Sequence, residues 1–151
     1  MIGTHFTYAP EETVRLARSF ARELKRNDVV ALYGELGCGK TRFVKGVCEE
    51  FQAATPATSP SFVFLNRYEG KDNAGKELLL YHFDLYRVRS LEEIYELGLE
   101  EFLRAGGICF VEWADVLGDL LPRTRYDVRF SYAEREEHRK IDIAAHGMRS
   151  T

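Results

Sequence analysis

The sequence predicts a three-layer α/β domain with a mixed sheet, and three observations support this fold class. Residues 29–51 are typical of a buried strand, a glycine-rich loop and an amphipathic helix in direct succession. Residues 108–111 form a second short apolar run, which suits a buried strand of the same sheet. The polar connections at 69–77 and 134–138 are too short for a crossover helix, so each is expected to join antiparallel strands. We therefore expect one domain over residues 1–151.

The first third of the chain is expected to contribute an edge strand, two helices and the central strand. Residues 4–8 alternate weakly in polarity, as an edge strand does. Pro10 favours the start of a helix, and apolar residues then recur on one helical face until Asn27, a plausible stop. The strand at 29–33 is almost entirely apolar, and residues 40–51 repeat apolar side chains at helical spacing.

The rest of the chain is expected to form two hairpins, a buried strand and two further helices. Two prolines and several hydroxyl residues make 52–61 a loop. The remaining expected elements are strands at 62–68 and 78–85, a helix at 91–104 with a break near Gly98, the strand at 108–111, a short helix at 114–121, and strands around 126–132 and 141–145. Their order gives a sheet with a parallel core and antiparallel hairpins.

Composition excludes some classes of function. The net charge of −3 and a pI of about 5.8 argue against a protein that grips bare DNA or RNA through its overall field. Basic residues do gather near the C-terminus, where a solvated face is favoured and an RNA-facing edge stays open: Arg123, Arg125, Arg129, Arg135, Arg139 and Lys140. None of the three cysteines belongs to a C-x-x-C pair, and no apolar run is long enough to span a membrane. A cytoplasmic protein with reduced thiols and no membrane partner is therefore expected.

The loop at 34–41 matches the phosphate-loop pattern G-x-x-x-x-G-K-[ST] at every fixed position. Its three glycines allow the backbone to curl around an anion, and the following helix adds the positive end of its dipole. Lys40 is expected to carry the charge that meets the β- and γ-phosphates, and the Thr41 hydroxyl is placed to hold Mg²⁺. The loop therefore predicts nucleotide binding.

Two acidic residues lie where a second ligand for the nucleotide-bound Mg²⁺ is expected. Asp84 and Glu112 each follow an apolar run directly, so each is expected at a strand end beside Thr41. One would ligate Mg²⁺ and the other would hold its water or orient the attacking water, and the sequence does not decide which. His82 lies two residues before Asp84 on the same face, either orienting that acid or simply packing in the core.

The sequence resembles the TsaE (YjeE) family from about residue 4 to residue 146. The motifs that carry the resemblance are the phosphate loop, Ser59-Pro-Ser-Phe62, His82-Phe-Asp-Leu-Tyr-Arg87 and Glu112-Trp113. The resemblance implies a P-loop NTPase fold and an ATP-binding, ATP-hydrolysing subunit, dependent on Mg²⁺ and slow alone. It implies a requirement for threonylcarbamoyladenosine at position 37 of tRNA, made together with the TsaB and TsaD proteins, with tRNA reached only through that complex.

The resemblance also implies roles for individual residues. Lys40 and Asp84 would serve hydrolysis, and Thr41 and Glu112 would ligate Mg²⁺. The nucleotide would contact Thr13, Gly37, Cys38, Gly39, Lys40, Thr41, Arg42 and Trp113. Cys38 and Arg42 depart from the family pattern. We expect the Cys38 thiol to lie against the phosphates, where alkylation would block ATP binding. Arg42 carries no hydroxyl, so Thr41 would be the only one of the two residues that could ligate the metal.

Three other functions compete with this interpretation. A small-molecule P-loop kinase would need an acceptor pocket and usually a lid, and no insertion of lid length is apparent. A GTP-driven switch is disfavoured because the chain contains no Asn-Lys-x-Asp tetrapeptide. A nucleotide-gated binding subunit with negligible turnover remains open, since no arginine finger in cis is obvious.

Overall fold

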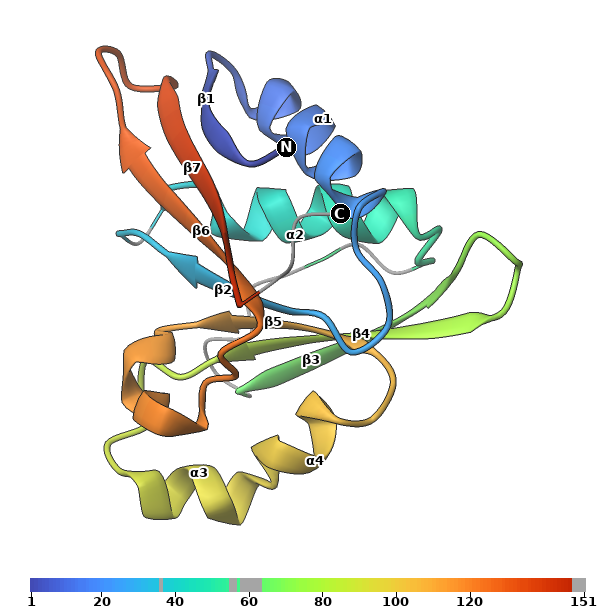
Figure 1. Ribbon diagram of the computed structural model, residues 1–151. Coiled ribbons are helices and arrows are strands. Elements are labelled where there is room, and N and C mark those ends of the chain that lie inside the picture. Colours follow the sequence, from blue (N-terminus) through green and yellow to red (C-terminus); the bar gives the residue numbers. More distant parts are fainter. Residues whose placement is uncertain (36, 55–56, 58–63, 148–151) are drawn as a thin grey trace.

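The computed structural model (Figure 1) describes residues 1–35, 37–54, 57 and 64–147. Seven strands form one sheet, and helices cover both of its faces. The elements are β1 (Gly3–Thr7), α1 (Pro10–Ala21), β2 (Val29–Tyr33), α2 (Lys40–Glu50), β3 (Leu65–Lys71), β4 (Glu77–Asp84), α3 (Leu91–Leu97), α4 (Leu99–Leu103), β5 (Ile108–Glu112), the 3₁₀ helix η1 (Ala114–Leu120), β6 (Arg125–Tyr132) and β7 (Arg139–His146).

The sheet is mixed, as predicted, and its order is β1-β7-β6-β2-β5-β4-β3. The central strand β2 runs parallel to both β5 and β6, and β5 runs parallel to β4. The pairs β3–β4 and β6–β7 are antiparallel hairpins, which confirms both expected hairpins. The edge strand β1 completes the sheet by pairing antiparallel with β7.

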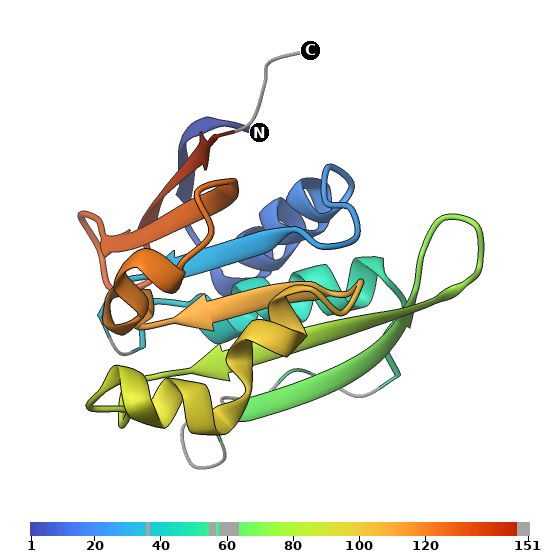
Figure 2. The same ribbon diagram turned by 60° about the horizontal axis from the view of Figure 1, so that its bottom comes forward.

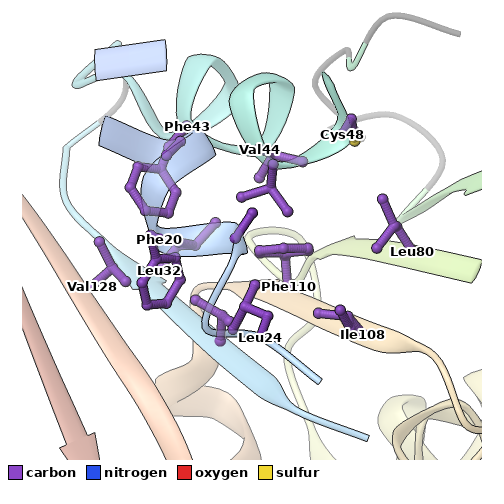
Figure 3. Packing of buried hydrophobic residues seen from close by; sticks show 14 of the residues in the cluster. Phe20, Leu24, Leu32, Phe43, Val44, Cys48, Leu80, Ile108, Phe110 and Val128 are labelled. Carbon is purple, nitrogen blue, oxygen red and sulfur yellow. The ribbon is translucent and has the colours of Figure 1, made fainter. Parts of the chain in front are cut away.

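Alternation along the strands divides the buried side chains between two apolar clusters. In β2, Val30 and Leu32 pack with Phe20 of α1 and Phe43 of α2, and Figure 3 shows these rings and the neighbouring aliphatic side chains in contact. The alternate residues of β2, Val29 and Ala31, belong to the second cluster, which also contains residues of α3, α4 and η1. Figures 1 and 2 show α1 and α2 on one face of the sheet and the other helices on the opposite face. The three-layer prediction is confirmed.

Gly46 lets α2 lie directly on α1. A Cβ atom at this position would stand 2.4 Å from the carbonyl oxygen of Val14 and 2.7 Å from the Cβ of Ala17, so any side chain would push the helices apart. Because α2 begins at the phosphate loop, this contact fixes the direction of the helix whose N-terminus faces that loop.

The first helix is shorter than predicted. It ends at Ala21, and the chain then tightens into turns in which Glu23 N–H donates to Phe20 O and Leu24 N–H to Ala21 O, both at 3.0 Å. These turns keep Leu24 on the buried face. This explains why the helical spacing of apolar residues in the sequence continues beyond the end of the helix. Asn27 does adopt a left-handed conformation, with φ 70°, but in the loop that leads to β2.

Other differences are small. The expected break at Gly98 separates α3 from α4, and the expected helix after β5 is a 3₁₀ helix. The strand expected from residue 62 begins at Leu65, and residues 62–63 lie outside the described part of the chain. Within that described part, every helix is too short or too polar to span a bilayer.

Candidate functional site

The phosphate loop joins the carboxyl end of β2 to the first turn of α2, as its motif requires. Gly34, Gly37 and Gly39 have φ values of 147°, 82° and 104°, which confirms the need for glycine in the curled backbone. At Gly34 a Cβ would also stand 2.8 Å from the backbone oxygen of Phe130 on the neighbouring strand. The loop leads directly into the N-terminus of α2. The first N–H groups of a helix have no acceptor within the helix, so this is a binding arrangement for an anion.

Lys40 places a positive charge at the mouth of this loop. Its Nζ donates to the Gly34 carbonyl oxygen at 2.6 Å and lies 3.4 Å from Glu112 Oε1. The same nitrogen stands 5.3 Å from the centre of the Trp113 ring, and Lys40 is only 6% exposed. The buried ammonium thus contacts a carbonyl, a carboxylate and a ring face, and phosphate oxygens are acceptors that could replace these partners.

The two candidate acids lie side by side at adjacent strand ends. Asp84 closes β4 and Glu112 closes β5, and they are register partners in this parallel pair. Their neighbours Phe83 and Val111 belong to the apolar cluster on the α3 side, so both acids point toward α2 and the loop. The sheet therefore brings together the two carboxylates that the sequence singled out, although which one ligates a metal stays a prediction.

His82 contacts Glu112 rather than Asp84. Its Nε2 lies 2.7 Å from Glu112 Oε2, and its ring is fully buried. Burial works to raise the pKa of Glu112, but the hydrogen bond and charge of His82, together with the charge of Lys40, hold that pKa below its usual value. Glu112 is thus kept as a carboxylate. The sequence suggested either an orienting contact with Asp84 on the same strand or packing in the core, whereas the hydrogen bond goes to an acid on the next strand.

The donor set suits Mg²⁺. Glu112 offers an ionised carboxylate, and Thr41, half-buried in the first turn of α2, offers a hydroxyl oxygen. Among the described residues there is no cluster of three His, Cys, Asp or Glu that would cage a metal. A cation here would take its remaining ligands from phosphate oxygens and water, which is how Mg²⁺ commonly binds with nucleotides.

Trp113 lies beside Lys40, and its contact with a nucleotide stays a prediction. The residue is 37% exposed and has a left-handed backbone, with φ 60° and ψ 42°, which is strained for a bulky side chain. Its ring is 5.0 Å from the ring of Tyr86. Trp113 and Lys40 line a cavity of about 350 Å³ together with Leu32, Tyr33, Gly34, Glu35, Asp115 and Arg129.

A second cavity, of about 240 Å³, borders the loop at Gly37 and Gly39. It is lined by Pro10, Thr13, Gly37, Gly39, Arg42, Glu136, Glu137 and Arg139. The fold thus brings the predicted contact residues Thr13 and Arg42 next to the loop glycines. The Thr13 hydroxyl is hydrogen-bonded to the Thr7 hydroxyl at 2.8 Å, and its contact with a nucleotide stays a prediction.

The Cys38 thiol does not face the phosphates, contrary to our expectation. Its side chain is 1% exposed and belongs to the apolar cluster beneath α1 and α2. Cys38 still contributes its backbone to the loop. The other two thiols are also buried, and burial raises the pKa of both Cys48 and Cys109 to about 12.

We therefore expect the native protein to resist thiol reagents. At pH 8 a chromogenic disulfide should react with none of the three cysteines within minutes, and with all three once the protein is unfolded in guanidinium. The measurement is the absorbance of the released thiolate, with and without denaturant. Rapid native labelling of one thiol, mapped to Cys38 by mass spectrometry, would contradict the inward orientation.

Two residues at this site were missed by the sequence interpretation. Tyr132 was placed only as part of a strand, and Arg139 was counted among the solvated basic residues. In the structure Arg139 Nε donates to the Cys38 carbonyl oxygen at 3.2 Å, and its guanidinium lies 4.4 Å from the Tyr132 ring. The register of the β6–β7 hairpin was the signal that could have found them. The motif at 59–62 lies outside the described residues.

Comparison with known proteins shows the family of this chain. The sequence model of the family described as "Threonylcarbamoyl adenosine biosynthesis protein TsaE" matches residues 7–141. The chain belongs to the TsaE family. It is 38% identical to the TsaE protein of Bacillus subtilis over 95% of this chain and 85% of that protein. It is 42% identical to the TsaE protein of Rickettsia conorii over 78% of this chain, and the match spans 64% of that relative's length.

A solved structure has a similar fold. The crystal structure of Bacillus subtilis YdiB superposes with a TM-score of 0.74 at 35% sequence identity, covering 95% of this chain and 85% of that one. The predicted fold class, a P-loop NTPase fold with a mixed sheet, is therefore confirmed for this TsaE-family chain.

Proposed function

We propose that this TsaE-family protein binds and hydrolyses ATP with Mg²⁺ as a subunit required for threonylcarbamoyladenosine at position 37 of tRNA. The observation that carries the proposal is the position of Lys40. Its ammonium sits at the mouth of a curled glycine loop and contacts Glu112, whose pKa is held low. A cation, an anion-binding backbone and an ionised carboxylate in one place are the parts that phosphoryl transfer from a metal-bound nucleotide needs.

In this proposal each part of the site has a distinct task. The loop N–H groups and Lys40 bind the β- and γ-phosphates, and Lys40 compensates charge that builds up between them during bond cleavage. Glu112 and Thr41 would hold Mg²⁺, which supplies further charge neutralisation when it is bound. Asp84, one strand away, orients the attacking water, and Trp113 covers the mouth of the loop.

The proposal also includes partners and a location. The chain would act with the TsaB and TsaD proteins, and it would reach tRNA through them. Its acidic net charge of −3 supports indirect rather than direct contact with tRNA. Its three free cysteines suit a reducing compartment, for which we propose the cytoplasm.

We expect the ATPase rate to be slow for the isolated chain and to rise at least about tenfold when a TsaB–TsaD pair is added, because charge-stabilising groups supplied in trans accelerate such sites strongly. Phosphate release is the measurement, and ATP-dependent co-elution with the pair is its companion. If neither stimulation nor co-elution is observed, the proposed partnership is contradicted. Failure of the gene to restore the modified nucleoside in a bacterium lacking its own TsaE would count against the role in biosynthesis.

One observation favours a second candidate, a small-molecule kinase. The cavity of about 350 Å³ beside Lys40 offers room for a phosphate acceptor, and Tyr33, Asp115 and Arg129 supply polar groups on its wall. Turnover measured with and without a panel of nucleosides and sugars separates the candidates. Acceptor-dependent ADP formation supports the kinase, and turnover that responds only to protein partners supports the ATPase.

A further inference from the structure

We propose that Arg139 is a positioning residue that holds the phosphate loop in its anion-binding shape, with the Tyr132 ring as its platform. We call these two residues the loop brace. The inference deepens the proposed nucleotide binding and rests on it. It assigns a role to a residue that lies nearly one hundred positions from the loop in sequence and contacts that loop only in the folded sheet.

Arg139 joins three parts of the structure through one side chain. Its Nε donates to the Cys38 carbonyl oxygen at 3.2 Å, within the loop. Its Nη1 donates to the carbonyl oxygens of Glu136 at 2.5 Å and His138 at 3.0 Å, in the turn between β6 and β7. Its guanidinium carbon lies 4.4 Å from the Tyr132 ring, a stacking distance. The rigid planar fork of arginine matches these separate acceptors at once.

The hairpin geometry explains why these two residues reach the loop. Tyr132 and Arg139 are register partners at the last rung of the β6–β7 ladder. Two residues further along, Phe130 and Ile141 belong to the apolar cluster beneath α1 and α2. Because side chains alternate along a strand, Tyr132 and Arg139 point to the same face, which is the face that the phosphate loop covers.

Tyr132 covers the loop at the neighbouring position. A Cβ atom on Gly37 would stand 3.5 Å from the Tyr132 hydroxyl, so that hydroxyl is packed against the glycine. The neighbouring Cys38 side chain is the main cause of a raised pKa of Tyr132. The brace therefore contacts both Gly37 and Cys38.

The hydrogen bond from Arg139 determines which way the N–H group of Gly39 points. In a planar trans peptide the carbonyl oxygen of Cys38 and the N–H of Gly39 point in opposite directions. A carbonyl held by Arg139 on the outer side of the loop thus turns the Gly39 N–H toward the inner side, where a phosphate would bind. Gly39 stands on one side of this peptide and Gly37 precedes Cys38 on the other, and glycine backbones rotate freely, so without the brace the peptide would sample other orientations.

The experiment compares Arg139→Gln with the wild-type chain and with Arg135→Gln, a matched change at an exposed arginine of the same turn. Backbone ¹⁵N order parameters are measured for residues 37–40 in the nucleotide-free protein, and the Kd for ADP is measured by titration. We expect Arg139→Gln to lower the order parameters of these residues and to weaken ADP binding about tenfold, the effect of one lost charge-assisted hydrogen bond. Arg135→Gln should leave both within twofold of wild type.

Further variants and outcomes make the test decisive. Arg139→Lys keeps the charge without the planar fork, and we expect intermediate affinity; it also replaces Arg139→Gln if that variant does not fold. Unchanged loop order, or unchanged affinity, in the Arg139 variants overturns the brace. A loss of affinity with unchanged loop order also overturns it, because Arg139 would then act on the nucleotide directly. If the wild-type chain fails to bind ADP, the proposed function fails, whereas the order parameters still test the brace.

Discussion

Replacing Lys40 with alanine is expected to abolish measurable nucleotide binding. The change removes the ammonium that would meet two phosphates, and it leaves the Gly34 carbonyl and the Glu112 carboxylate without their buried partner. Charge-assisted bonds of this kind contribute about 1.5–3 kcal/mol each, so we expect the Kd for ADP to rise at least about 100-fold. Fluorescence titration with a labelled ADP measures the change.

The matched control for this prediction is Lys45→Ala, which removes a lysine from the same helix but away from the loop. Circular dichroism establishes that both variants are folded. If Lys40→Ala binds ADP as tightly as the control does, the site has been assigned to the wrong place, and the proposed function falls with it.

Replacing Glu112 with glutamine is expected to remove the Mg²⁺ dependence of the site. Glutamine preserves the shape of the side chain and an oxygen for His82, but it carries no charge for a divalent cation or for Lys40. We expect ATP turnover to fall at least about 100-fold, a loss typical when a group that stabilises charge in the transition state is removed. In the presence of EDTA, ADP affinity should change little, because the loop and Lys40 remain.

Asp84→Asn is the variant that decides between the two acids. If Glu112 ligates the metal and Asp84 orients the water, the Glu112 variant loses Mg²⁺-enhanced binding and turnover, whereas the Asp84 variant loses turnover and keeps Mg²⁺-enhanced binding. Isothermal titration of ADP with and without Mg²⁺ reports the binding, and phosphate release reports the turnover. The reverse pattern would exchange the two roles.

The brace and the two acids illustrate different degrees of predictability. Asp84 and Glu112 could be found from sequence because each follows a buried strand, and the carboxyl ends of parallel strands meet at one edge of a sheet. The loop could be found because its glycines and Lys40 occupy positions that its backbone geometry requires. In these cases the pattern is local and its physical cause lies within a few residues.

Contacts between distant elements were not predictable in the same way. His82 shares a strand with Asp84, but its hydrogen bond goes to Glu112 on the next strand, and only the sheet register reveals this. Arg139 looked like one more exposed basic residue until the β6–β7 register placed it over the loop. The end of α1 was misplaced because apolar spacing continues through the turns after Ala21.

The amino-acid order alone thus determined the strand–loop–helix unit, both hairpins and the mixed sheet, and it singled out the loop and the two acids of the candidate site. These features follow from backbone requirements and side-chain periodicity, which act over short distances along the chain. The tertiary structure decided which way the Cys38 thiol points, which acid His82 contacts and what supports the loop. Those outcomes depend on how seven strands pair, and pairing joins residues that no local pattern connects.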